Sequence, residues 1–234
     1  MRVAQVWTFS RVALSTSRID LAAEQGLAER FALVRRIADD LAHELKNPLN
    51  AMVINLEVLR SRVRAGDAGA ALERIDVLEQ EIRRLHDLLD QVLRLLRPEP
   101  AGGPAAFPVT VLAAEVGTIA AVLGKLARRG FELRLPGAEV LVLGRREPLR
   151  FALLALCEAA ITGLSAEDDV AVLEVVAGSA EVQLTLASPA AAAPRLQGAL
   201  PVAASLLAED GIALGAALDE TGYRVRIVLA RATT

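Results

Sequence analysis

The chain has 234 residues, of which 53% are hydrophobic and 24% are charged, and its formal net charge is -3. This length allows one large domain or two small ones with a buried core, and the composition excludes a disordered chain. One Cys and two His exclude a disulfide framework and leave little material for a metal site, so we expect no bound metal. The charge balance gives no reason to expect nucleic acid as a partner.

No apolar run approaches the roughly 20 residues that a membrane-spanning helix needs. Polar residues interrupt the opening segment Met1–Leu14, which makes it a poor signal peptide. We therefore expect a cytoplasmic protein with no membrane partner. Residues 1–26 have no assigned role at this point, and could extend a following helix or pack on a later domain.

Two runs of apolar residues before Pro98 repeat at alternating steps of four and three. The first extends from Leu27 to Leu59, and the second from Ile75 to Leu96. This spacing is typical of helices that pack along a seam with a period of 3.5 residues. A break with two glycines lies between the runs, so residues 27–98 are predicted to form a long antiparallel helical hairpin.

The apolar stripe of this hairpin is wider than one partner helix covers. The additional apolar positions beside the seams are Val53, Leu56, Val63, Leu88, Leu93 and Leu95. A symmetric dimer that forms a four-helix bundle would cover them, and this is the favoured interpretation. The alternative is that the second half of the same chain covers this face.

Residues 99–106 are rich in Pro and Gly and are predicted to be a linker. Residues 107–231 then mix helical and strand-like patterns. The predicted helices are Val109–Arg129, Pro148–Leu164 and a shorter one near Leu200–Glu209. The predicted strands are Phe131–Leu135, Val140–Leu143, Val170–Val176, Val182–Leu186, Ile212–Leu218 and Tyr223–Leu229. Turn signals at Pro136-Gly137, Gly178-Ser179 and Thr221-Gly222 predict hairpins, in one sheet with helices on one face.

The motif His43-Glu44-Leu45-Lys46-Asn47-Pro48-Leu49 lies in the middle of the first predicted helix. Because Leu45 belongs to the seam, His43 is predicted to point to solvent, and Asn47 shares its face. Pro48 is expected to bend the helix one turn after the histidine.

This heptapeptide resembles the phosphoacceptor box of the sensor histidine kinases. The resemblance implies that His43 takes a phosphoryl group, with Glu44 as its general base. Asn47 corresponds to the position that orients water when such proteins dephosphorylate a partner. The looser similarity of the remaining chain implies an α/β sandwich of the GHKL type, the ATP-binding domain of these kinases. The fold class expected is thus α plus α/β.

The nucleotide-binding residues that the resemblance implies are missing. In the helix Pro148–Leu164, the positions expected to hold Asn are Ala155 and Ala159, or Leu154 and Glu158, and no Asn follows Asn55. The segment Ala187–Pro194 replaces an expected Asp-x-Gly-x-Gly, and the lid that follows shrinks to Arg195–Pro201. We therefore expect a degenerate sandwich that binds no ATP, and no autokinase activity.

The leading hypothesis is a histidine phosphotransferase of a two-component phosphorelay. It would shuttle phosphate between His43 and the aspartates of response-regulator receiver domains, which supply their own Mg²⁺. The alternatives are a regulatory pseudokinase that dephosphorylates or sequesters a receiver, and a kinase that binds nucleotide through an unusual set of residues. The expected partners are a second copy of the chain and receiver domains.

A stripe outside the seam is predicted to dock the receiver. It starts at His43 and Asn47 and continues through Asn50, Ile54 and Val58. Apolar residues beside a reactive polar group favour a partner surface, although the sandwich could instead fold over them. His86, next to seam residue Leu85, is predicted to be half-buried, and Cys157 is predicted to be a core residue.

Overall fold

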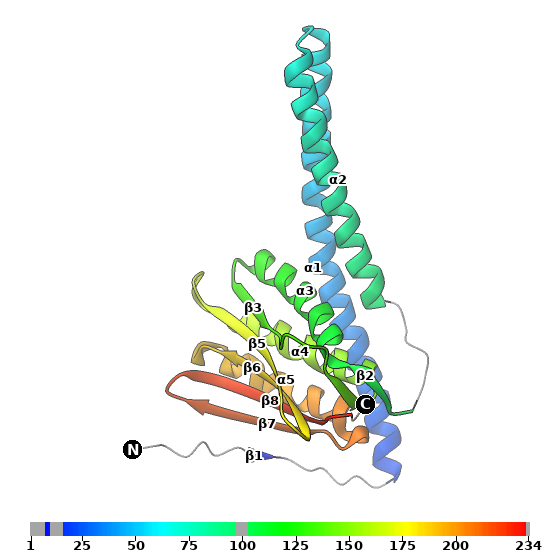
Figure 1. Cartoon of the computed structure of the whole chain (residues 1–234), viewed down its shortest axis with the longest axis vertical. Helices are drawn as coiled ribbons and strands as arrows, with labels where there is room; N and C mark the ends of the chain where they lie inside the picture. The colour runs from blue at the N-terminus through cyan, green and yellow to red at the C-terminus, as the bar shows by residue number, and fades with distance from the viewer. Residues whose placement is uncertain (1–7, 10–15, 97–102, 233–234) are drawn as a thin grey trace. The chain divides into compact units, whose positions relative to one another are not determined.

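The computed structural model describes residues 8–9, 16–96 and 103–232 (Figure 1). Residues 34–98 form one compact unit, and the other described residues form a second unit. The first unit is entirely helical, and the second contains every strand. The predicted class, a helical region followed by an α/β domain, is confirmed.

The helical unit is an antiparallel hairpin of α2 (Ala68–Leu96) and the part of α1 (Thr16–Arg64) from residue 34 onward. Gly66 makes the turn with φ of +74°, and the Asp67 carboxylate accepts the backbone N–H of Ala70 at 3.1 Å, which caps the start of α2. Because α1 starts at Thr16, part of the segment 1–26 extends the first helix.

The contact between the two helices uses only part of the predicted seam. On α2, Ala71 and Leu78 are buried and Leu85 is half-buried, whereas the side chains of Ile75 and Ile82 are 41% and 54% exposed. Leu89 is likewise exposed at 43%. The contact with α1 thus uses alternate positions of the expected seam on α2. Successive seam positions point alternately to α1 and to the adjoining face, because a helix turns by about 100° per residue.

The main sheet of the second unit has six strands in the order β1-β7-β8-β6-β5-β3. Only the β3–β5 pair is parallel. In that order the strands are β1 (Thr8–Phe9), β7 (Ala213–Asp219), β8 (Gly222–Ala230), β6 (Glu181–Ser188), β5 (Val170–Ala177) and β3 (Gly130–Arg134).

A second sheet pairs β2 (Ala105–Pro108) with β4 (Leu141–Gly144). The predictions of one sheet and of a hairpin at Pro136-Gly137 are thus wrong, since β3 and β4 do not pair with each other. From β4 the chain continues through α4 (Arg146–Gly163) and returns to the main sheet as β5, parallel to β3. The turns at Gly178-Ser179 and Thr221-Gly222 do connect paired strands, as predicted.

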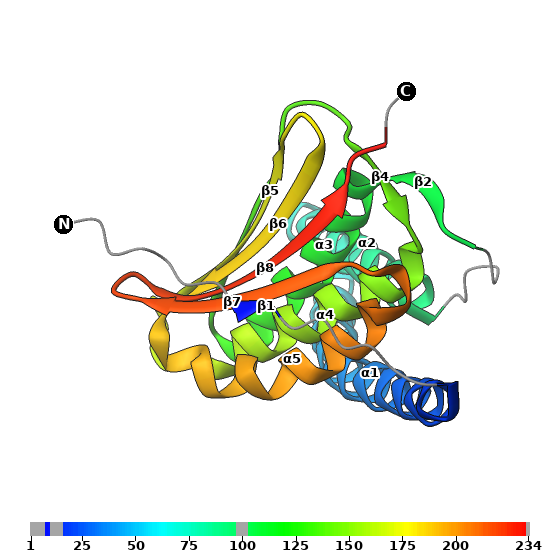
Figure 2. The same cartoon turned by 90° about the horizontal axis from the view of Figure 1, so that it is seen from below.

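Three helices cover one face of the main sheet: α3 (Val109–Ala127), α4 and α5 (Ala193–Leu207) (Figure 2). Strand residues that face them, such as Leu173, Leu184 and Ile227, are at most 1% exposed. Cys157 on α4 is 1% exposed, so its predicted core position is confirmed. Among the described helices, α3 alone is long and apolar enough to span a membrane, but more than half of it is buried in this core.

Candidate functional site

The predicted phosphoacceptor motif lies wholly within α1. Lys46, Asn47 and Leu49 are exposed, and Pro48 is buried inside a helix that continues past it. The side chains of His43 and Glu44 lie outside the described residues. The direction of the imidazole and the reach of Glu44 to it therefore stay predictions.

The proposed docking stripe continues along the same helix. Asn50 is exposed, and the side chain of Ile54 is 62% exposed. Val58 is only half-buried, since it lies beside Leu59 at the border of the face that meets α2. One turn away, the Asn55 carboxamide accepts a hydrogen bond from Arg74 of α2 at 3.3 Å, which marks that inner face.

A second exposed face of the hairpin is apolar, and we call it the outer seam. Its side chains are between 41% and 63% exposed. The α1 members are Leu49, Val53, Leu56 and Val63, and the α2 members are Leu72, Ile75, Ile82, Leu89 and Leu93. Sequence reasoning found Val53, Leu56, Val63 and Leu93 but missed Leu49 and Leu72. The side chains of Leu88 and Leu95 lie outside the described residues.

In the second unit, α4 offers apolar side chains where a nucleotide domain would need Mg²⁺ ligands. Leu154, Ala155 and Ala159 are buried. Glu158 is half-buried and already has an interaction partner. No group of three His, Cys, Asp or Glu among the described residues could hold a metal ion. Three of these four positions therefore carry no Mg²⁺ ligand, and we derive no step through Mg-ATP.

The segment after β6 is packed rather than open. Ala190–Ala192 form a short 3-10 helix, and α5 begins at Ala193, so the predicted lid Arg195–Pro201 is helical instead of a free loop. At Gly163 of α4, an added Cβ would lie 2.8 Å from the Cα of Ala192. The predicted start of the last helix near Leu200 is thus wrong, because the Ala-rich stretch packs its small residues on α4.

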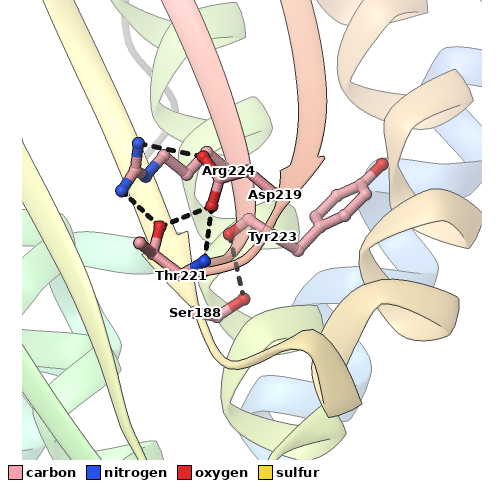
Figure 3. A network of polar contacts seen from close by, with 5 residues as sticks. All are labelled: Ser188, Asp219, Thr221, Tyr223 and Arg224. Atoms are coloured by element: carbon pink, nitrogen blue, oxygen red, sulfur yellow. Dashed lines mark hydrogen bonds and ion pairs between the residues drawn. The ribbon is translucent and has the colours of Figure 1, made fainter. Parts of the chain in front are cut away.

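The β7–β8 turn carries a polar network beside the end of β6 (Figure 3). The Asp219 carboxylate accepts the Thr221 backbone N–H at 2.8 Å and also pairs with Arg224 at 3.2 Å. The buried Ser188 hydroxyl donates to the Tyr223 carbonyl at 3.5 Å. Burial raises the pKa of the Tyr223 phenol. The contacts among Asp219, Thr221 and Arg224 hold the turn in place, and the phenol of Tyr223 is hydrogen-bonded to Gln197 instead.

A buried ion pair joins two distant parts of the sandwich, and sequence reasoning missed it. The Asp210 side chain is 3% exposed and accepts the Arg145 guanidinium at 2.8 Å and the Arg145 backbone N–H at 3.2 Å. It ties the start of α4 to the end of the segment that follows α5. No local pattern could reveal a pair 65 positions apart in the chain.

The hairpin is similar to a family of known proteins. Residues 33–101 match the family "His Kinase A (phospho-acceptor) domain". The chain is 32% identical over 119 residues to the sensor protein CzcS of Cupriavidus metallidurans; the match covers 50% of this chain and 25% of CzcS. The chain thus spans a quarter of the length of that curated relative.

Solved structures of histidine kinases show partial similarity to the chain. The catalytic domain of histidine kinase ThkA has a TM-score of 0.48 at 12% identity, over 56% of this chain and 99% of that domain. ThkA in complex with the response regulator TrrA has a TM-score of 0.48 at 14% identity, over 94% of this chain and 68% of that one. The cytoplasmic segment of QseC has a TM-score of 0.43 at 17% identity, over 62% and 92%.

The match of residues 33–101 covers α1 from Leu33 onward and the whole of α2, and it includes His43. Residues 33–101 are therefore similar to the phosphoacceptor domain of histidine kinases, and this family match covers the hairpin and not the α/β domain after it.

Proposed function

We propose that this chain is a histidine phosphotransferase of a two-component phosphorelay, which moves phosphoryl groups between His43 and receiver aspartates without using ATP. One observation carries the proposal. His43 lies in a segment that matches the phosphoacceptor family, while the domain after it has apolar residues where nucleotide ligands are required.

The proposed chemistry is a transfer in two symmetric steps. A ring nitrogen of neutral His43 attacks the phosphorus of an aspartyl phosphate; the P–N bond forms as the P–O bond to the aspartate breaks, and the carboxylate leaves. Glu44 accepts the proton that the ring carries in excess. A second receiver aspartate then attacks the phosphorus; the P–O bond forms as the P–N bond breaks, Glu44 returns the proton to the ring, and neutral imidazole leaves. The receiver contributes Mg²⁺, so this chain contributes the nucleophile and its position.

Asn47 supports a second candidate function, the dephosphorylation or sequestration of a receiver. Its side chain is exposed one turn from His43, and a carboxamide can both donate to and accept from an attacking water. In that case phosphate goes to water rather than to a second receiver.

The homodimer is part of the proposal, and the outer seam supports it. An exposed apolar heptad on one helix packs best against a partner helix whose apolar residues repeat at the same spacing. On α3 the exposed positions at this spacing are Val111, Thr118 and Lys125, so that helix offers no such face. A second copy of the hairpin does, and the two together make a four-helix bundle. A cytoplasmic location, where receivers act, completes the proposal.

Labelled phosphoreceivers test the function directly. Incubation with the full chain should place label on the wild type and then on a second receiver, and His43→Ala should abolish both. Gln80→Ala, an exposed change on α2, is the matched control and should behave as wild type. Prompt release of phosphate that Asn47→Ala stops would support the second candidate. Transfer by His43→Ala, or self-labelling with Mg-ATP, would overturn the proposal.

A further inference from the structure

The apolar residues of the outer seam on α2 follow a heptad repeat, but they do not occupy all of its positions. Alternating steps of three and four from Leu72 to Leu93 pass through two polar positions, Glu79 and His86. Both residues are exposed in the hairpin, with side chains 58% and 74% accessible. The prediction of a half-buried His86 is therefore wrong, because His86 belongs to the outer seam and not to the face toward α1.

Each polar position has a charged neighbour one turn along the same helix. The Glu79 carboxylate pairs with Arg83 at 3.1 Å, and Nε2 of His86 lies 3.8 Å from the Asp90 carboxylate. Arg83 and Asp90 stand beside the seam rather than on it. Each polar seam residue therefore has a charged neighbour at the border of the face that a second helix would cover.

We infer that Glu79 and His86 are the residues that make this hairpin pair with a second copy of itself in preference to other hairpins. This inference rests on the proposed homodimer. A two-fold axis along the bundle places equal residues of the two copies at equal height, so each polar layer meets the same polar layer. Arg83 and Asp90 then supply compensating charge at the border. A foreign hairpin with an all-apolar seam would leave Glu79 and His86 against hydrocarbon, which disfavours that pairing.

The outer seam on α2 is long enough to contain both polar layers and the apolar layers that hold the two copies together. From Leu72 to Leu93 it extends for about 32 Å at 1.5 Å per residue, and the two polar layers lie seven residues apart within it. Apolar layers on both sides, at Ile75, Ile82 and Leu89, supply the association energy. Polar residues at such positions lower stability and raise specificity in paired helices.

The test compares full-length wild type with Glu79→Leu, His86→Leu and the double variant. Sedimentation measures the dimer dissociation constant, and each single variant should bind itself about tenfold more tightly than wild type. In an equal mixture of differently tagged wild type and double variant, subunit exchange should give clearly less than the half share of mixed dimers that random pairing gives. Gln80→Leu, off the seam on the same helix, should change neither quantity.

Two results would overturn the inference. One is Leu variants that match Gln80→Leu in dissociation constant, and the other is a statistical share of mixed dimers. A wild type that stays monomeric would overturn the homodimer as well. Transfer of label to His43 is measured independently of both, so a failed pairing test leaves the phosphotransferase proposal to its own experiment.

Discussion

At the scale of single residues, Ile54 offers the sharpest test of the docking stripe. Its side chain is 62% exposed on a helix face that also carries Asn47 and Asn50. Burying a side chain of this size against a partner contributes about 1.5–3 kcal/mol. We expect Ile54→Glu to slow transfer from a phosphoreceiver to His43 by about tenfold or more, because it loses that contact and adds a charge to the interface. Single-turnover transfer rates measure this.

A matched substitution separates docking from a general surface effect. Val176 on β5 is 49% exposed, and Val176→Glu makes the same kind of change far along the chain from the stripe. Its transfer rate should equal that of wild type. Equal rates for Ile54→Glu and wild type would remove Ile54 from the docking surface.

Cys157 reports on the integrity of the sandwich. It is the only cysteine of the chain, and burial raises its pKa from the ordinary 9.0 to about 12. Near pH 8 the folded protein therefore presents a buried neutral thiol, and only the thiolate reacts with iodoacetamide. We expect labelling to proceed no faster than unfolding of the domain. Mass spectrometry follows it, and rapid labelling of the folded protein would contradict the buried position.

The same raised pKa has a consequence for stability at high pH. The unfolded chain releases the thiol proton near pH 9, whereas the folded chain keeps it until about pH 12. The contribution of the buried thiol to stability is therefore complete below pH 9 and is lost as the pH rises from 9 to 12. We expect the unfolding midpoint of wild type to fall more steeply in this range than that of Cys157→Ala.

At the scale of the secondary structure elements, the ion pair of Arg145 and Asp210 connects α4 with the end of the α5 segment. Asp210→Ala removes both hydrogen bonds that Arg145 donates to this carboxylate, and at about 1.5 kcal/mol for each bond with a charged group the loss is about 3 kcal/mol. Asp210→Ala should therefore speed the unfolding-limited labelling of Cys157 by about 100-fold. Asp168→Ala, at an exposed position of the same unit, should leave the rate unchanged. Equal rates for the two variants would show that the pair contributes no stability.

Periodicity predicted most elements because most of them are governed by local burial. Buried and more exposed residues alternate along β5, β6 and β8, and α3 and α4 carry long apolar faces. These elements could therefore be predicted from the spacing of apolar residues in the sequence. The short β2 was not predicted, because the Ala-Ala-Phe-Pro sequence carries no alternation and pairs with β4 across the whole of α3. Which strand pairs with which depends on that non-local contact.

The candidate site likewise has features that the sequence predicts and features that depend on tertiary contacts. The motif around His43 could be placed on a helix from sequence, since a helix needs only local spacing. The faces of α2 could not be separated, because alternating steps of three and four fit both the contact with α1 and the outer seam. Only the tertiary contact shows that Leu78 is buried while Ile82 is exposed.

At the scale of the whole molecule, the two units differ in the functional residues that they carry. The hairpin retains its motif, whereas in the sandwich Ala192 packs against Gly163 and apolar residues occupy the ligand positions of α4. In the proposed function, transfer among receivers requires only the first unit. The second unit should therefore be indifferent to nucleotide while transfer continues.

Thermal unfolding of the full chain with and without Mg-ATP tests this division of labour. A ligand at a hundredfold excess over its dissociation constant stabilises a folded domain by about 2.7 kcal/mol, which is a shift of several degrees. We expect no saturable shift and no binding heat by calorimetry, with Mg²⁺ alone as the control, because Leu154, Ala155 and Ala159 of α4 offer no ligand to Mg²⁺. The same preparation should still accept phosphate from a receiver with no nucleotide present. A saturable shift would mean that the packed α4–α5 layer opens for ATP, and that this chain is to be treated as a kinase.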